Sequence, residues 1–137
     1  LKEKNLSEKP NDLLLIKKLA QAKYFLLDFE GALKAFEMGR KIDNGDLDFM
    51  LGEANIRLLL EKDNISKKTI YLFEEIIKKD NNNISALIVL ANYNYSIKNY
   101  ISSEKYYKKL LSLIDKNSLE YKSIQKNLDE IKIINDK

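Results

Sequence analysis

Apolar residues recur at helical spacing along most of the chain, and short polar breaks divide this pattern into segments. The breaks contain Asp, Asn, Gly and Ser, which cap helices or turn the chain. They fall near positions 27–28, 43–45, 63–66, 80–83, 98–99 and 115–118. The segments between them are each about 12 to 18 residues long. These breaks predict seven helices, and the short connections predict that neighbouring helices form antiparallel hairpins.

The composition supports a helical domain. Hydrophobic residues make up 45% of the 137 residues and charged residues 33%, which is too apolar for a disordered chain. With 4 glycines and 1 proline, the chain has little turn chemistry for the hairpins of a sandwich or barrel. We therefore predict an all-α fold. Residues 1–11 are polar and end in Pro10-Asn11, which predicts a flexible N-terminal tail followed by a domain over residues 12–137.

The predicted hairpins share a pattern of aromatic and small residues. Phe36, Phe73 and Tyr107 take equivalent places in the second helices, 37 and 34 positions apart. The first helices match at Leu19-Ala20, Leu51-Gly52 and Leu90-Ala91. This alignment predicts repeats over residues 13–46, 47–83 and 84–117, with about five extra residues in the second. An amphipathic segment over residues 118–134 is expected to cap the last repeat.

A helix-turn-helix repeat of 34 residues with this pattern resembles the tetratricopeptide repeat (TPR) family. The resemblance implies a right-handed superhelix of antiparallel hairpins. The chain departs from the family where a closing proline is usual, since Asn44, Asn81 and Asp115 stand there. The alternative is an unrelated helical bundle whose aromatic residues coincide with the pattern by chance.

The resemblance also implies a concave groove lined by the first helix of each repeat. Mapping the family's groove positions onto this chain places aromatic and aliphatic anchors beside polar residues that would orient a ligand. The predicted anchors are Tyr24, Phe25, Phe49, Ile56, Ile88 and Tyr95, beside Leu14. The predicted orienting residues are Lys17, Gln21, Glu53, Arg57 and Asn92. The alternative for Phe25, Phe49 and Ile56 is packing against the terminal helix or a neighbouring chain.

Some TPR domains bind a C-terminal carboxylate through paired Lys and Asn residues. The matching positions here read Lys17, Gln21, Met50, Ser85 and Val89, so that clamp is not expected. A free carboxylate would find Lys17 and Arg57 as its cations.

Charge and side-chain chemistry exclude several function classes. The net charge is +3, spread along the chain, and Arg40 and Arg57 are its two arginines, so we expect no nucleic-acid partner. The chain has no Cys and no His, which excludes the common zinc sites and nucleophile pairs. We expect no catalytic residue, no enzymatic activity, no metal and no cofactor. No window has the roughly 18 apolar residues that a membrane span needs.

The sequence therefore predicts a non-catalytic adaptor or scaffold that binds a peptide or helical segment of a protein partner in its groove. One alternative is a chaperone for a secreted or membrane-associated client. Another is a structural subunit that associates with itself. For location, the cytoplasm is favoured, and export is the alternative should a leader have been removed.

Overall fold

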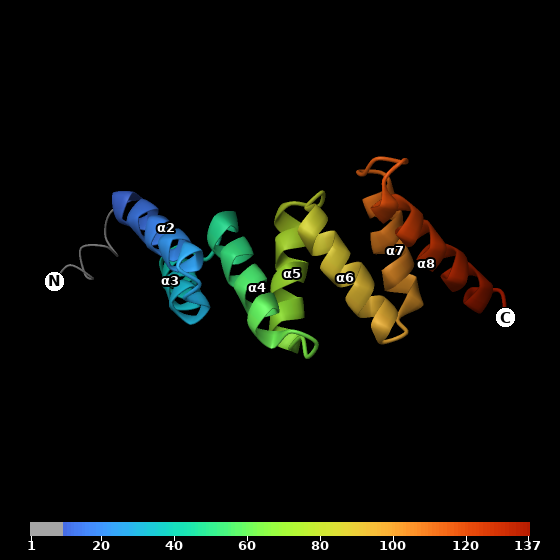
Figure 1. Ribbon diagram of the computed structural model, residues 1–137, viewed down its shortest axis with the longest axis horizontal. Coiled ribbons are helices and arrows are strands. Elements are labelled where there is room, and N and C mark those ends of the chain that lie inside the picture. The colour runs from blue at the N-terminus through green and yellow to red at the C-terminus, as the bar shows by residue number, and fades with distance from the viewer. Residues whose placement is uncertain (1–9) are drawn as a thin grey trace. The chain divides into compact units, whose positions relative to one another are not determined.

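A computed structural model describes residues 10–137 (Figure 1). This part of the chain contains seven α-helices and no strand, which confirms the predicted all-α class. Residues 1–9 of the predicted tail lie outside the described residues, and Pro10 and Asn11 are already helical. The helices are α2 (Pro10–Phe25), α3 (Phe29–Ile42), α4 (Leu47–Glu61), α5 (Lys67–Lys79), α6 (Ile84–Ser96), α7 (Tyr100–Leu111) and α8 (Leu119–Asn135).

The chain divides into two compact units, and the division falls within α5. The first unit runs to Leu72, and the second runs from Phe73 to Lys137. The first therefore holds α2, α3, α4 and the start of α5. The second holds the rest of α5 with α6, α7 and α8.

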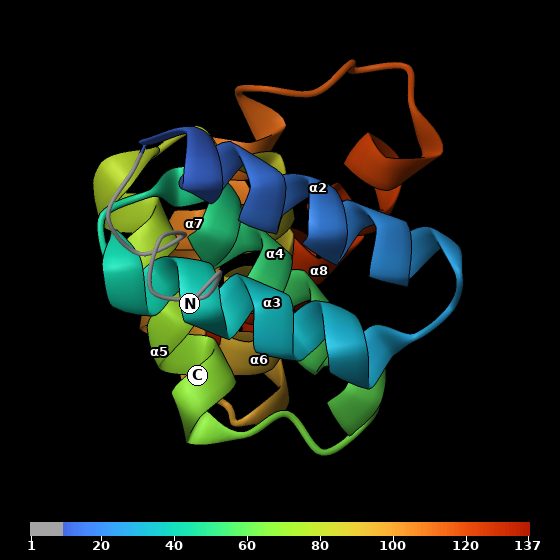
Figure 2. The ribbon, with the colours of Figure 1, turned by 90° about the vertical axis from the view of Figure 1, so that its left-hand side faces the viewer.

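Helices α2 and α3 lie side by side as a hairpin in the first unit (Figures 1 and 2). The turn between them is a Schellman motif, in which the N–H of Asp28 donates to the carbonyl of Lys23 and that of Leu27 to Tyr24, both at 2.9 Å. Asp28 then caps α3, because its Oδ1 accepts from the Gly31 N–H at 2.9 Å. The predicted break at 27–28 thus both ends one helix and starts the next.

Two reciprocal contacts between aromatic rings and glycines join α3 to α4. A Cβ added at Gly39 of α3 would collide with the ring of Phe49 of α4. In the same way, a Cβ added at Gly52 of α4 would collide with the ring of Phe36 of α3. Only glycine leaves room for a ring at these two positions, so this helix pair packs closely.

Pairs of buried small residues mark where each first helix meets its second helix. Ala20 and Ala32 are buried in the first repeat, and Ala91 and Ser103 in the third. In the second repeat the buried pair is Ala54 and Thr69. Figure 1 shows two of the helix pairs to which they belong, α2 with α3 and α6 with α7. Small side chains at these points let the helix backbones approach each other.

This register corrects the predicted alignment of the second repeat. Gly52 is not the counterpart of Ala20, because it packs under Phe36 of the preceding helix. Ala54 is the counterpart, two positions later. Thr69 follows Ala54 by 15 positions, whereas the other two pairs are 12 apart, so the second repeat carries three extra residues here. The Glu61 carboxylate closes this longer connection by accepting from the Ser66 N–H at 2.8 Å and the Thr69 hydroxyl at 2.9 Å.

The core of the second unit combines α6, α7 and α8. Helix α6 packs against α7, and α7 against α8. The terminal helix contributes two buried isoleucines to a cluster formed by Leu87, Ala91, Tyr107, Leu110, Ile124 and Ile131. Because Ile124 and Ile131 lie seven positions apart, they share one face of α8.

Candidate functional site

The corrected register changes which residues of α4 match the groove positions predicted on α2 and α6. In α2 these positions are Leu14, Lys17, Gln21, Tyr24 and Phe25. In α6 they are Ile88, Asn92 and Tyr95, and Ser85 and Ser96 stand at the equivalents of Leu14 and Phe25. The matching residues of α4 are Asp48, Leu51, Asn55, Leu58 and Leu59. All fifteen side chains are exposed or half-buried. In each repeat, the face of the first helix that carries these positions is therefore uncovered.

The structure contradicts an accessible role for Phe49, Glu53 and Ile56. All three side chains are buried: Phe49 and Ile56 cannot line an open groove, and Glu53 meets open space only at the charged hollow described below. Phe49 packs on Gly39 of α3 instead. Sequence reasoning misplaced them because Gly52 and Ala54 are both small, and either could have been the residue at the helix crossing.

The predicted groove residues of α2 are exposed or form ion pairs. Leu14, Gln21, Tyr24 and Phe25 are exposed, and Phe25 retains 82% of its accessible surface. Lys17 Nζ lies 2.9 Å from Asp46 Oδ2 and 3.2 Å from Asp48 Oδ2. Its hydrogen bond to Asp46 raises the pKa of Lys17, so this lysine stays charged. Lys17 therefore joins α2 to the start of α4.

Arg57 is committed to a buried ion-pair network. Its Nε lies 2.8 Å from Glu53 Oε2, and its Nη2 lies 3.0 Å from Glu37 Oε2. Arg40 Nη1 binds the other Glu53 oxygen at 2.8 Å. Burial acts to raise the pKa of Glu53, but the hydrogen bonds from Arg57 and Arg40 outweigh it and leave that pKa lowered. Both expected carboxylate-binding cations, Lys17 and Arg57, thus already have anionic partners.

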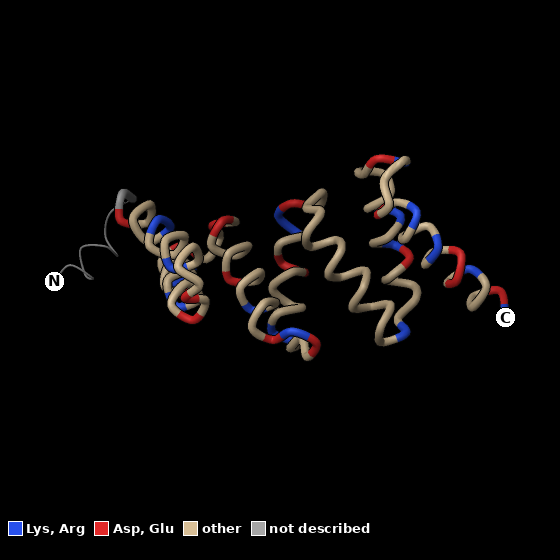
Figure 3. Tube along the Cα trace, in the orientation of Figure 1, with Lys and Arg blue, Asp and Glu red and all other residues tan. Residues whose placement is uncertain are grey.

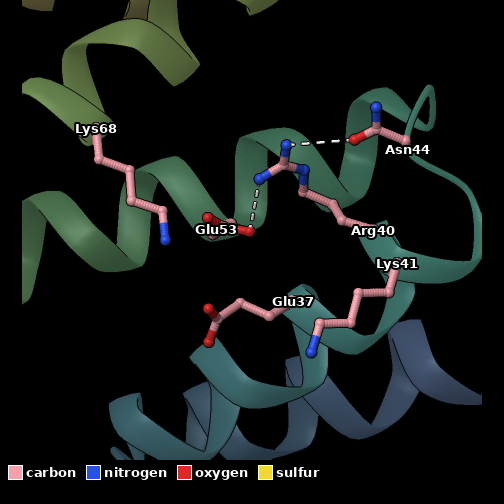
Figure 4. A pocket seen from close by; sticks show the side chains of 6 residues that line it. All are labelled: Glu37, Arg40, Lys41, Asn44, Glu53 and Lys68. Carbon is pink, nitrogen blue, oxygen red and sulfur yellow. Dashed lines mark hydrogen bonds and ion pairs between the residues drawn. The ribbon is translucent and has the colours of Figure 1, made fainter.

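A charged hollow adjoins this network (Figure 4). It has a volume of about 350 Å³. Both acidic and basic side chains line it, so neither sign of charge dominates and it lacks the concentration of like charge that selects an ionic ligand. The lining residues are Glu37, Arg40, Lys41, Asn44, Glu53 and Lys68.

A second cavity, in the other unit, contains two predicted groove residues. Its volume is about 340 Å³, and Ile88 and Asn92 of α6 line it together with residues of α7 and α8. The aliphatic part of the wall is Ile88, Leu110, Leu119 and Ile124. Helix α6 carries no charged residue, the only such helix in the part of the chain that the structure describes (Figure 3). The rest of the wall is polar and includes one carboxylate, that of Glu120.

Part of the polar wall is a hydrogen-bonded chain through Tyr107. The Tyr107 hydroxyl donates to Asn92 Oδ1 at 2.6 Å, and Asn127 Nδ2 donates to the same hydroxyl at 3.1 Å. Burial raises the pKa of Tyr107, so the hydroxyl keeps its proton. Sequence reasoning identified Asn92 but not Tyr107 or Asn127. The three residues come from three helices, and no local pattern links them.

Tyr95, another predicted anchor, is held by α8. Its hydroxyl donates to Glu130 Oε2 at 2.5 Å, which raises the pKa of Tyr95 to about 12. Its ring makes edge contacts with Tyr100 and Tyr107, at centroid distances of 5.8 and 6.3 Å. Tyr95 is thus half-buried and bonded to α8, whereas Tyr24 and Ile88 are exposed.

Residues 10–137 contain neither a candidate metal site nor a candidate membrane span. No group of three or more acidic side chains is placed to hold a metal ion. No helix in this range has both the length and the hydropathy that crossing a bilayer requires.

The repeated hairpins and the recurring small-residue crossings define a TPR-like helical-repeat fold. Solved structures share it. The type III secretion chaperone SycD of Yersinia enterocolitica, in complex with a peptide of the translocator YopD, matches with a TM-score of 0.67 at 20% identity, over 93% of this chain and 97% of the SycD chain in that structure. A second structure, of the translocator chaperone SycD as an alternative dimer, matches at 0.64 and 21% identity, over 94% and 98%. PcrH from Pseudomonas aeruginosa matches at 0.63 and 14% identity, over 90% and 94%. No family model and no curated protein matches the chain.

Proposed function

We propose that this protein is a TPR-family chaperone that binds a segment of a client protein on the uncovered face of its first helices. One observation carries the proposal. The matched positions of α2, α4 and α6 stay accessible although the neighbouring positions of the same helices are buried. Large apolar side chains such as Tyr24, Leu59 and Ile88 lie among them. Apolar anchors between neutral polar residues suit a peptide ligand.

The comparisons support a peptide as the ligand. SycD, whose fold this chain shares over nearly its full length, was solved with a peptide of a translocator. We favour a chaperone over an adaptor because the SycD structures that share this fold are those of a chaperone. The two functions differ in the client, since the client of a chaperone is insoluble or unstable when alone.

Capture of client proteins tests the binding face. We expect the wild-type protein to retain at least one protein from a lysate of its native organism. The double variant Tyr24→Ala, Ile88→Ala should lose that protein, because both side chains are exposed at matched positions. The control is Ile101→Ala, whose side chain is exposed on α7, outside this face. Equal capture by the double variant would show that another surface binds.

Co-expression separates a chaperone from an adaptor. The captured client is expressed alone, with the wild-type protein and with the double variant. We expect soluble client only with the wild-type protein. A client that is equally soluble in all three cases would make the protein an adaptor.

Self-association is a second candidate function, and the turn between α2 and α3 favours it. Phe25, Leu26 and Leu27 are exposed there, and Leu27 retains 73% of its accessible surface. The same Schellman turn after α6 has Lys98 in place of Leu27, with the same hydrogen bonds. The turn therefore does not require an apolar residue, and the three adjacent exposed apolar side chains favour a contact with another molecule.

Light scattering tests this second candidate. We expect the wild-type mass to rise with concentration toward that of a dimer, and Leu27→Lys to remain a monomer. Lys is the matched replacement because Lys98 occupies the equivalent position in the turn after α6. A wild-type protein that stays monomeric at millimolar concentration would contradict self-association.

A further inference from the structure

The turns that precede α4, α6 and α8 share one construction. Each begins with an aspartate whose carboxylate accepts from the N–H two positions on and whose carbonyl accepts from the N–H three positions on. The aspartates are Asp43, Asp80 and Asp115. The last residue of each turn caps the helix that follows, and these caps are Asp46, Asn83 and Ser118. The three turns can therefore be compared position by position.

The third position of this turn does not require glycine. Its occupants are Gly45, Asn82 and Asn117. Gly45 does not have a positive φ, so it does not use the conformational freedom of glycine. Asn82 and Asn117 donate the same hydrogen bond to the aspartate carboxylate, at 3.3 and 2.9 Å against 3.1 Å for Gly45. The backbone of the turn thus gives no reason for a glycine.

A glycine that directly follows an asparagine has a chemical consequence. The nitrogen of the following residue can attack the Asn side-chain carbonyl and close a succinimide ring, and a Cβ on that residue hinders the approach. Asparagine is for this reason among the thermolabile residues of proteins. Asn44 precedes Gly45 and Asn81 precedes Asn82, and all four are exposed. The two turns therefore present the same amide to attacking residues of different bulk.

We propose that Asn44 is a site of spontaneous deamidation, in which the Gly45 nitrogen bonds to the Asn44 Cγ and the side-chain amide leaves as ammonia. The proton of the Gly45 N–H passes to the Asp43 carboxylate, which already accepts a hydrogen bond from it at 3.1 Å, and then to the leaving nitrogen. Water next opens the succinimide ring. Cleavage between the Gly45 nitrogen and Cγ gives aspartate, whereas cleavage at the main-chain carbonyl gives isoaspartate, whose main chain runs through the side chain.

Both products bring a carboxylate to the ion-pair network of α3 and α4. Asn44 Oδ1 accepts from Arg40 Nη2 at 3.4 Å (Figure 4). A carboxylate binds a guanidinium more strongly than an amide does. The new group therefore competes for Arg40 with Glu53, which it approaches across the same hollow.

Isoaspartate also lengthens the main chain of the turn by one methylene group. The turn places Asp46, whose N–H donates to the Asp43 carbonyl at 3.2 Å. Asp46 in turn caps α4 by accepting from the Phe49 N–H at 3.1 Å, and it pairs with Lys17 of α2 at 2.9 Å. We therefore expect isoaspartate at position 44 to loosen the start of α4 and its link to α2.

Exchange of the third residue between two turns tests the site. The full chain is incubated at neutral pH for several weeks and digested, and mass spectrometry compares the peptides that contain positions 44 and 81. We expect Asn44 to be converted and Asn81 to stay intact. Gly45→Asn should stop conversion of Asn44, and Asn82→Gly should start conversion of Asn81. Each variant places in one turn a residue that the other turn already holds, so both turns can form.

The outcomes decide the proposal directly. No conversion of Asn44, equal conversion of Asn44 and Asn81 in the wild type, or continued conversion in Gly45→Asn would overturn it. An isoaspartate methyltransferase, which modifies isoaspartate and not aspartate, distinguishes the two products.

The stability of the products tests the effect on α4. Asn44→Asp supplies the aspartate product, and chromatography of aged wild-type protein supplies the isoaspartate form. Calorimetry should give the isoaspartate form a lower melting temperature than both the fresh wild type and Asn44→Asp. Equal melting temperatures for the two products would show that the length of the turn does not control the start of α4.

Discussion

Leu27 and Lys98 adopt left-handed backbone conformations, with φ of 61° and 65°. Each occupies the C′ position of a Schellman motif, where glycine is usual because it has no Cβ. A left-handed residue other than glycine costs about 1 to 2 kcal/mol. The chain thus accepts strain at both of these turns, and the side chain at one of them is a leucine exposed to solvent; Lys62, after α4, is a third residue with a positive φ, of 55°.

Relief of that strain is a first prediction. Lys98→Gly should raise the free energy of unfolding by about 1 kcal/mol, because glycine adopts a positive φ at little steric cost. Urea denaturation followed by circular dichroism measures the change. Lys105→Gly is the control, since Lys105 is exposed within α7 and glycine there should lower stability by about 1 kcal/mol. A loss of stability in Lys98→Gly would show that the turn is not strained.

Gly39 provides a second prediction at the residue scale. Gly39→Ala should lower the free energy of unfolding by about 1 to 3 kcal/mol, because the new methyl group collides with the Phe49 ring. Helix propensity alone would predict a gain of about 1 kcal/mol, so the sign of the change decides. In a double-mutant cycle, Phe49→Leu should couple to Gly39→Ala by more than about 0.5 kcal/mol. Additive effects would mean that the ring does not press on this glycine.

At the scale of elements, the two arginines of the chain join α3 to α4 in a network around the buried carboxylate of Glu53. Glu53 belongs to α4 and Arg40 to α3, while Arg57 lies one turn after Glu53 and reaches Glu37 of α3. The lysines of the chain form more exposed pairs, such as Lys78 with Glu75 and Lys108 with Glu104, which contribute little to stability.

Removing one arginine tests this network. Arg57→Met should lower the free energy of unfolding by about 3 kcal/mol, because it leaves a buried carboxylate with one cation. Lys108→Met, which breaks an exposed pair, should change it by less than about 0.5 kcal/mol and serves as the control. Similar effects in the two variants would mean that burial of Glu53 adds nothing.

The lowered pKa of Glu53 predicts how stability changes with pH. In the unfolded chain, a Glu carboxyl titrates near its ordinary value of about 4.3. The folded pKa lies below this unfolded value. The contribution of Glu53 to stability is therefore complete above the unfolded pKa of about 4.3, and it is lost as the pH falls from there through the folded pKa. Urea denaturation between pH 7 and pH 3 should therefore show a smaller acid-dependent loss in Glu53→Gln than in wild type. Parallel pH profiles would contradict the lowered pKa.

At the scale of the whole molecule, the last helix is part of the fold of the second unit. Its two buried isoleucines complete the cluster around Tyr107, and its Asn127 and Glu130 bond tyrosines of α7 and α6. Helix α8 thus also supplies part of the wall of the cavity that Ile88 and Asn92 line.

Neighbouring isoleucines of α8 test its contribution. Ile131→Ala should lower the free energy of unfolding by about 3 kcal/mol, the cost of removing a buried aliphatic side chain. Ile133→Ala, two positions away and exposed, should change it by less than about 0.5 kcal/mol. Thermal unfolding measured by calorimetry gives both values. Equal effects would mean that α8 is not docked on the unit.

The sequence determined the helices and their ends, because caps and turns act within a few residues. Asp28, for example, caps α3 through a bond to Gly31. The register of α4 needed the tertiary structure, since Gly52 and Ala54 are both small. Only the packing of Phe36 on Gly52 decided between them. The network of Tyr107 with Asn92 and Asn127 joins residues 15 and 20 positions apart, beyond any local pattern. The helices can therefore be predicted from the sequence because their hydrogen bonds are local, whereas the site depends on side chains that only packing brings together.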